Sequence, residues 1–284
     1  MNFFYTKQSG VALLQVLLMS AVISVLALQM SYSAKDKVSI AQVIQDKVMA
    51  EVAVRTMESE LLFALSTARW AKDEQHENKL AQIWNFYGSP FEYEDIGTIT
   101  IQDNSGLISV FNGGDRSTVE RAFERLLGSK HQARVARNAL IDTQGFQNST
   151  NGAGISGQFF QSRQEMLRAL KELGIPSSKA EVFTRIPYSA YLPLQAPDES
   201  LKLWLPERQA KAVIESRQNG ELTPQLFTQL TGLRKSDYML FYPSGRFIIT
   251  LKKQIGDARV QRKMFINVSP TNKSQPIWSF GVEG

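Results

Sequence analysis

A stretch of 20 residues without a charged side chain, Val11 to Met30, constrains the fold of this chain more than any other feature. At 1.5 Å per residue, a helix of this length is about 30 Å long, which matches the hydrocarbon thickness of a bilayer. Its polar side chains are uncharged, so their insertion into lipid costs little free energy. They are Gln15, Ser20, Ser24 and Gln29. The stretch therefore predicts a membrane-spanning helix.

Three interpretations compete for this N-terminus. A cleaved secretory signal has an apolar region of only about 7–15 residues and a small-x-small cleavage site. Ser31-Tyr32-Ser33 fits that site, but the apolar run is too long. An ordinary signal anchor is the second interpretation. The third is a prepilin-type leader, residues 1–10, cut between Gly10 and Val11, because a glycine directly precedes the apolar run.

The residues after the stretch favour the third interpretation. No glycine or proline occurs between Val11 and Tyr87, and apolar residues recur there at steps of three and four, the helical period. They are Ile40, Ile44, Val48 and Val52, then Val54, Met57, Leu61, Leu65 and Ala68. We expect a transmembrane and assembly helix at 11–32 that continues as an amphipathic helix over 33–87, helical to about Trp70. Its apolar stripe should pack on a globular domain, which is the arrangement of a pilin.

The composition argues against several classes of function. The 32 basic and 27 acidic side chains are interspersed, which indicates a mildly basic solvated surface rather than a nucleic-acid-binding face. The absence of cysteine excludes disulfides, thiolate metal sites and cysteine nucleophiles. The two histidines, His76 and His131, lie in polar stretches that are typical of surfaces. No nucleophile elbow, P-loop or zinc spacing occurs, so we expect no catalytic residue, no cofactor and no metal site.

After residue 87 the sequence becomes rich in β-forming segments. Thr98–Gln102 and Leu107–Phe111 flank a turn-forming Asp-Asn-Ser-Gly and predict a β-hairpin. Three further strands are expected, at Phe247–Leu251, Val260–Val268 and Ile277–Val282. The simplest packing places 88–111 and 236–284 in one antiparallel sheet on the long helix, which is an α+β, pilin-like fold.

Residues 112–235 predict a helical, SAM-like subdomain inserted into the sheet domain. Capping boxes or prolines mark the helix starts and glycines mark most of the ends. The expected helices run from Ser117 to Gly128, Gln132 to Leu140, Ser162 to Gly174, Pro206 to Gly220 and Thr223 to Gly232. Prolines 187, 193 and 197 predict an extended segment between the third and fourth of them.

Two patterns suggest chemistry that their context does not support. Gly152-x-Gly154-x-x-Gly157 matches a dinucleotide-binding pattern, but polar residues precede it where a strand is required, so we expect a flexible loop. Four acidic residues offer material for acid–base catalysis or calcium binding. They are Glu92, Glu94, Asp95 and Asp103. Because they flank the expected hairpin, we expect them on its solvated face.

With these motifs identified, the chain resembles the K-type minor pseudopilins of type II secretion systems (general secretion pathway protein K). Gly10-Val11-Ala12-Leu13-Leu14 is similar to the processing site of that family. Residues 97–106 are similar to its first hairpin, Ala139-Leu140-Ile141-Asp142 to one of its helix ends, and 231–247 to its late helical and β units. The resemblance covers most of the chain.

Two departures from related patterns bear on what the resemblance implies. Most pilin-like subunits carry a glutamate at the fifth mature position, where this chain has Gln15. The K family also lacks that glutamate. Its calcium site needs several acids after the Ala-Leu-x-Asp segment, whereas here no acid follows Asp142 until Glu165. The calcium site is therefore not carried over, because calcium requires six to eight oxygen ligands with negative charge.

The resemblance implies a tip subunit of the secretion pseudopilus that nucleates or caps assembly for protein export, with Val11 N-methylated. The implied partners are the I- and J-type minor pseudopilins, prepilin peptidase and inner-membrane lipid, without nucleic acid. The expected location is the inner membrane, crossed once, with the C-terminal domain in the periplasm. Lys7 precedes the apolar run and Lys35 and Lys37 follow it, so the positive-inside rule does not support this orientation.

Two alternatives stay open at this point. The first is a minor pilin of a type IV pilus. The second, from another class, is a membrane-anchored periplasmic enzyme or binding protein that uses the acidic residues of the expected hairpin. A pocket at residues 92–103 would favour the second alternative.

Overall fold

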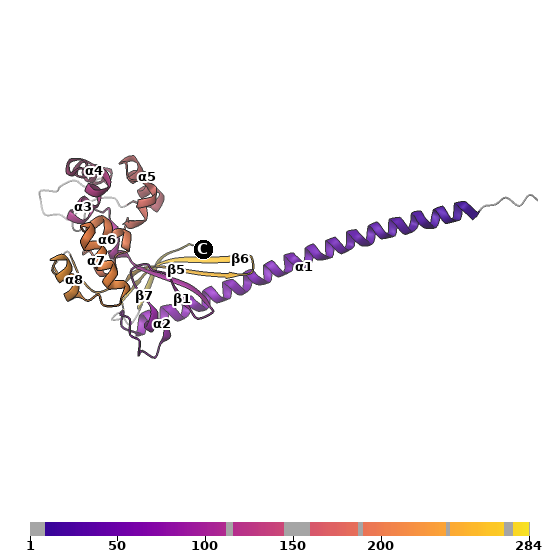
Figure 1. Cartoon of the computed structure of the whole chain (residues 1–284), viewed down its shortest axis with the longest axis horizontal. Coiled ribbons are helices and arrows are strands. Elements are labelled where there is room, and N and C mark those ends of the chain that lie inside the picture. Colours follow the sequence, from indigo (N-terminus) through magenta and orange to yellow (C-terminus); the bar gives the residue numbers. More distant parts are fainter. Residues whose placement is uncertain are drawn as a thin grey trace, which may run out of the picture. The chain divides into compact units, whose positions relative to one another are not determined.

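One long helix and one antiparallel sheet organise the fold. The computed structural model describes residues 9–111, 116–144, 160–186, 190–236, 239–269 and 275–283. Helix α1 runs from Ser9 to Thr67 as a single element (Figure 1). Its 59 residues correspond to about 90 Å at 1.5 Å per residue. The predicted continuity of the helix across residue 34 is therefore observed.

The helix ends earlier than the expected range of 33–87. After Thr67 the chain turns, and the Trp70 Nε1 donates a hydrogen bond to the Leu65 carbonyl oxygen at 2.8 Å. The segment up to residue 87 holds only a short helix, α2 (Lys79–Ile83), whose first turn is capped by the Asn78 side chain. The physical reason is the run of polar residues at 72–79, which has no apolar face to keep a helix on the core.

The chain divides into two units. One comprises Met1–Val52 with Gln254–Val260, and the other comprises Ala53–Lys253 with Gln261–Gly284. The first unit holds most of α1 and the turn at Gly256, whose φ of +54° a glycine adopts without strain. The second unit holds the end of α1, most of the sheet and the inserted helices.

The sheet has the strand order β1-β2-β5-β6-β7, and the predicted strands at 98–102, 247–251, 260–268 and 277–282 all belong to it. The strands are β1 (Phe91–Tyr93), β2 (Gly97–Asp103), β5 (Arg246–Ile255), β6 (Ala258–Val268) and β7 (Ile277–Glu283). In the antiparallel β2–β5 pair, Ile99 lies opposite Leu251 and Ile101 opposite Ile249. All four side chains are completely buried, as period-two alternation requires. The α+β class with a long helix on an antiparallel sheet is confirmed.

The predicted hairpin of residues 98–102 with 107–111 is wrong. Strand β2 has β1 on one side and β5 on the other, so neither edge is left for the second segment. A 3-10 turn, η1 (Asn104–Gly106), instead directs the chain away, and β3 (Ile108–Ser109) pairs in parallel with β4 (Phe183–Thr184). Ile108 joins the core of the helical block.

The helical block lies between β2 and β5 in the sequence, as predicted. Its helices are α3 (Arg116–Leu127), α4 (Lys130–Thr143), α5 (Arg163–Glu172), α6 (Asp198–Trp204), α7 (Glu207–Gln218) and α8 (Pro224–Thr231), with the 3-10 turns η2 (Ser177–Val182) and η3 (Pro193–Gln195). They share one hydrophobic core, at whose centre Phe123, Leu170 and Phe227 are completely buried.

The predicted helix limits in the block are mostly confirmed. Ser162 accepts a hydrogen bond from the Glu165 backbone nitrogen at 3.1 Å, and the Glu165 carboxylate accepts one from the Gln161 nitrogen at 2.7 Å. Ser162 is thus the N-cap, as predicted, while the carboxylate of Glu165 accepts from the residue before the N-cap rather than from the N-cap itself. Ser117 is not an N-cap, because α3 already includes Arg116. Helix α6 was not predicted and lies within the expected extended segment. The glycine pattern at 152–157 lies outside the described residues.

Candidate functional site

The first part of α1 presents apolar side chains on every face. The stretch that begins at Val11 has a mean hydropathy of 2.6 in its most apolar window, and none of that window is buried. Val11, Leu17 and Leu18 are each exposed by 61–64%. The helix is thus long and apolar enough to cross a membrane, and the side chains of this window are not buried by the residues that the structure describes.

The few polar groups in this part are compatible with lipid. The Ser24 Oγ donates to the Ser20 carbonyl oxygen at 2.8 Å, and the Ser31 Oγ donates to the Ala27 carbonyl oxygen at 2.9 Å. These bonds satisfy hydroxyl groups that otherwise lose water on entering hydrocarbon. Gln15, at the predicted assembly position, is exposed.

The middle of α1 carries an apolar stripe that is exposed. Residues Ile40, Ile44, Val48 and Val52 are 55–60% exposed. The prediction that these four side chains pack on the globular domain is wrong. The reason lies in helical geometry, because the next apolar residue of the series, Val54, follows Val52 by two positions, or about 200° around the helix. The buried stripe that includes Ala50 and Val54 therefore lies on another face.

The last part of α1 belongs to the core of the second unit. Val54, Met57, Leu61 and Leu65 are at most 2% exposed. The sheet approaches closely at Gly97, where an added Cβ would lie 2.8 Å from the Met57 Cε. An ion pair of 2.7 Å joins Glu58 to the Arg262 Nε on β6. The ring of Trp70 meets Phe247 edge-on at 5.4 Å between centroids.

The acidic residues considered as a catalytic or calcium site do not form one cluster. Glu92 accepts a hydrogen bond from Thr98 at 2.8 Å, and Glu94 pairs with Lys79. Asp103 is not on a solvated face but completely buried, where it accepts hydrogen bonds from Ser105 and Ser244. Burial raises the pKa of Asp103 to about 6, while the hydrogen bonds and Arg246 act in the opposite direction. The carboxylate of Asp103 therefore has a structural role, because it links the turn at Ser105 to Ser244.

One cavity beside β2 is lined by other residues. It measures about 320 Å³ and lies between β2, β5 and the helical block, with Thr100 and Gln102 on its sheet side. Its own carboxylates are Glu181, ion-paired with Arg163 at 2.5 Å, and Glu199, ion-paired with two lysines. Hydrogen bonds from these bases lower the pKa of both, that of Glu199 to about 2. Such carboxylates are ionised at neutral pH and unsuited to act as general acids.

The histidines and Asp142 show no ligand arrangement. The His76 Nδ1 accepts a hydrogen bond from the Asn78 backbone nitrogen at 2.9 Å, while His131 and Asp142 are exposed. Within the ranges that the structure describes, no group of three or more His, Asp or Glu side chains is placed to hold a metal ion.

No protein-family model and no curated protein matches the chain. Among solved structures, it is similar to a chain described as "The Crystal Structure of the GspK-GspI-GspJ complex from enterotoxigenic Escherichia coli Type 2 Secretion System". The identity is 11%, the TM-score is 0.46, and the alignment covers 88% of this chain and 98% of that chain. The secretion system in this description is the one that the sequence resemblance indicates. At this TM-score the match stands as a similarity alone.

Proposed function

We propose that the protein is a minor pseudopilin of a type II secretion system, anchored by α1 and assembled with other subunits through the same helix. The exposure of every apolar side chain in its first part is the observation that carries this proposal. Water would surround those side chains in an isolated chain, at a cost of about 25 cal/mol per Å² of apolar surface. Lipid before assembly, and neighbouring helices after it, remove that cost.

The middle stripe supports the assembly role. Ile44, Val48 and Val52 lie at steps of four on a part of α1 that also carries Lys35, Asp36 and Lys47. Charged groups exclude this part from the hydrocarbon region, so its apolar side chains need a protein surface. Amphipathic helices of neighbouring subunits offer such a surface, because their side chains repeat with the same period.

The leader and the fifth position refine the proposal. Residues 1–10 would be removed by prepilin peptidase, so that Val11 becomes the N-terminus and is methylated. Gln15 then lies in lipid without a charge. A glutamate at this position would need a partner amine to offset the cost of burying its carboxylate, and Gln15 does not. A subunit without that pairing suits a position at the tip. The inserted helices α3 to α8 add bulk that would oppose addition of a further subunit above it.

The proposed partners are the I- and J-type minor pseudopilins, as the sequence resemblance implies, together with prepilin peptidase and inner-membrane lipid. The helical and sheet parts would lie in the periplasm. Purification of the membrane-extracted full chain with candidate subunits distinguishes this role from that of a minor pilin. Recovery with I- and J-type pseudopilins is expected, and recovery with type IV pilus subunits instead would favour the alternative.

Processing of the N-terminus tests the proposal directly. The full chain is expressed with and without prepilin peptidase, and its first residue is determined by mass spectrometry. We expect Val11, with a methyl group, when the peptidase is present and Met1 when it is absent. The variant Gly10→Val should remain uncut, whereas Ser33→Val, which alters the secretory cleavage motif, should be cut normally. An intact Met1 with active peptidase present, or a chain that begins after Ser33, would contradict the proposal.

A further inference from the structure

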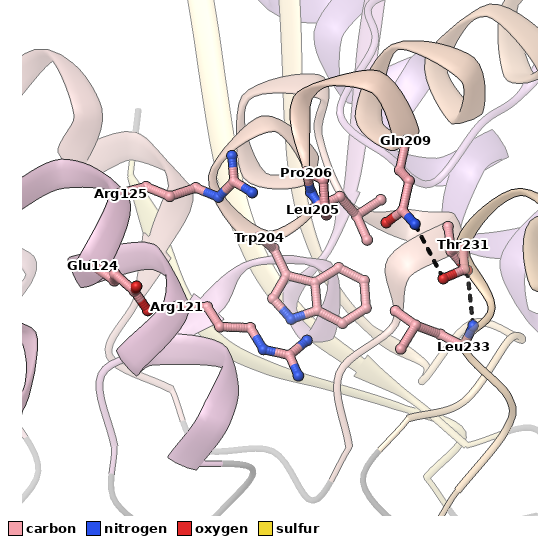
Figure 2. Close-up of a pocket in the computed structure, with 9 residues that line it drawn as sticks. All are labelled: Arg121, Glu124, Arg125, Trp204, Leu205, Pro206, Gln209, Thr231 and Leu233. Carbon is pink, nitrogen blue, oxygen red and sulfur yellow. Dashed lines mark hydrogen bonds between the residues drawn. The ribbon is translucent and has the colours of Figure 1, made fainter. Parts of the chain in front are cut away.

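The inserted helical block contains a hollow of about 400 Å³, and none of its lining residues belongs to α1 (Figure 2). Helix α3 forms one wall with Arg121 and Arg125, and the end of α6 contributes Trp204. Leu205 and Leu233 add apolar surface. A volume of this size lies in the range of small-ligand and side-chain pockets.

The floor of the hollow holds a buried donor without an acceptor. Trp204 is 5% exposed, and its Nε1 is buried without a hydrogen-bond partner among the residues that the structure describes. Figure 2 shows that nitrogen turned toward Arg121, whose guanidinium carbon lies 6.0 Å from the indole centroid. A guanidinium has no acceptor atom, so it cannot satisfy the indole N–H. An unsatisfied buried donor is destabilising, and an incoming acceptor would remove that cost.

The two arginines add positive charge without a counterion. Both are exposed, and no carboxylate within the described residues lies at ion-pair distance from either of them. On the same helix, Glu120 instead faces α4, where it lies 3.4 Å from Arg137. Arg121 and Arg125 lie one turn apart on α3, so their donors reach the same side of the helix.

The opposite wall needs no ligand. The Gln209 Nε2 donates to the Thr231 carbonyl oxygen at 3.3 Å, and the Leu233 backbone nitrogen donates to the Thr231 Oγ1 at 3.2 Å. Both bonds are drawn in Figure 2. The donors of the hollow that lack an acceptor among the described residues are therefore concentrated between α3 and Trp204, where the carboxylate of Glu124 also lines the hollow.

We propose that this hollow binds a carboxylate of a partner protein together with the apolar side chain next to it. The carboxylate would accept hydrogen bonds from the Trp204 Nε1 and from the two arginines, with Arg121 swinging off the indole to admit it. The neighbouring apolar side chain would pack on Leu205 and Leu233. A single carboxylate suits the hollow better than a phosphate, because Glu124 in its wall repels a second negative charge.

Indole N–H signals in the NMR spectrum of the detergent-solubilised full chain test this site. Trp204→Phe assigns the signal of Trp204 among the four tryptophans. The probes are N-acetyl-leucyl-glutamic acid with an amidated C-terminus, its glutamine counterpart, a leucyl-leucine peptide with a free carboxylate, the same peptide amidated, and inorganic phosphate. We expect the acidic peptides alone to move the Trp204 signal downfield in a saturable way. The two acidic probes show whether a side-chain or a C-terminal carboxylate is preferred.

Substitutions in the wall separate a built site from unspecific attraction. Arg121→Gln and Arg125→Gln should each weaken binding of the acidic peptide about tenfold, as expected for a lost charge-assisted hydrogen bond. Arg168→Gln removes an exposed arginine of α5 outside the hollow and should leave binding unchanged. Unchanged signals of the other indole groups verify that each variant is folded.

Several outcomes would overturn the proposal. If the amide and acidic peptides bind equally well, the carboxylate does not contribute to binding, and the hollow is only an apolar pocket. A shift with phosphate but not with peptide would assign the hollow to a phosphate ligand. Absence of any shift, or an equal loss of binding in Arg168→Gln, would show that the hollow is not a carboxylate site. None of these results depends on membrane anchoring or on cleavage of the leader.

Discussion

The first and last parts of helix α1 carry the same kinds of apolar side chain in opposite surroundings. Leu17 and Leu18 are 61–64% exposed, whereas Leu61 and Leu65 are completely buried. The first part has apolar side chains all round, while the last part alternates a buried face with charged residues such as Arg55 and Glu58. One helix thus meets two environments. The distribution of charge around its axis, rather than hydrophobicity itself, decides which part is covered by the chain's own fold.

The largest expected effect concerns the buried part. Leu61→Ala should lower the free energy of unfolding by about 3 kcal/mol, because it removes contacts and leaves a cavity between α1 and the sheet. Phe63→Ala, two residues away on the same helix, should change it by less than about 0.5 kcal/mol, because Phe63 is 65% exposed. Urea unfolding of the full chain in detergent, followed by tryptophan fluorescence, measures both. An equal loss of unfolding free energy in both variants would contradict the distinction between a buried and an exposed face of this part of α1.

The next effect concerns the exposed part. Leu18→Arg should disfavour membrane insertion by about 3 kcal/mol, because it places a charge near the middle of the apolar run. Ile40→Arg, at a similarly exposed position beyond the run, should have no such effect. Alkaline extraction of membranes followed by quantitative blotting reports the fraction that remains inserted. Full retention of the Leu18→Arg protein would contradict a lipid environment for this part.

A smaller effect distinguishes the first part of α1 from the folded unit that contains Asp103, because only the latter should respond to pH. The folded-state pKa of Asp103 is raised by burial to about 6, so the folded chain binds a proton more tightly than the unfolded chain does. Stability should therefore fall as pH rises from about 4 to 6, by at most about 1.4 kcal/mol per pH unit. Membrane retention should not change over this range, because the apolar run has no titratable side chain.

Variants at two aspartates provide the control for the pH effect. Asp103→Asn should flatten the dependence between pH 4 and 6, and Asp142→Asn, at an exposed position, should leave it unchanged. Glu199 acts in the opposite sense at lower pH, since its pKa is lowered to about 2. A slope that persists in Asp103→Asn would assign the effect to another group.

Features that depend on neighbouring residues were predictable from the sequence. The long helix, the N-cap at Ser162 and the left-handed end at Gly232 follow from local composition and spacing. The pairing of β3 with β4 joins residues about 75 apart, and no local pattern specifies it. The residues around Asp103 predicted that its carboxylate is exposed. It is buried because it bonds to Ser244, which is 141 residues away in the sequence.

The surfaces of α1 that form the candidate site were also predictable only where they depend on neighbouring residues in the sequence. The apolar run from Val11 and the stripe from Val54 follow from composition and period. The exposure of Ile40, Ile44, Val48 and Val52 accompanies the two-residue step from Val52 to Val54, which places the two stripes on different faces of the helix and which the prediction did not take into account. The hollow beside Trp204 brings α3, α6 and α8 together, and no sequence motif connects them.

Labelling of single cysteines tests the central contrast most directly, because the chain has no cysteine of its own. Leu18→Cys, Phe63→Cys and Leu61→Cys are introduced separately into the full chain in spheroplasts and exposed to a membrane-impermeant maleimide. We predict rapid labelling at position 63, protection at 61 until denaturant unfolds the core, and protection at 18 until detergent removes the lipid. Rapid labelling at position 18 in intact membranes would contradict the account.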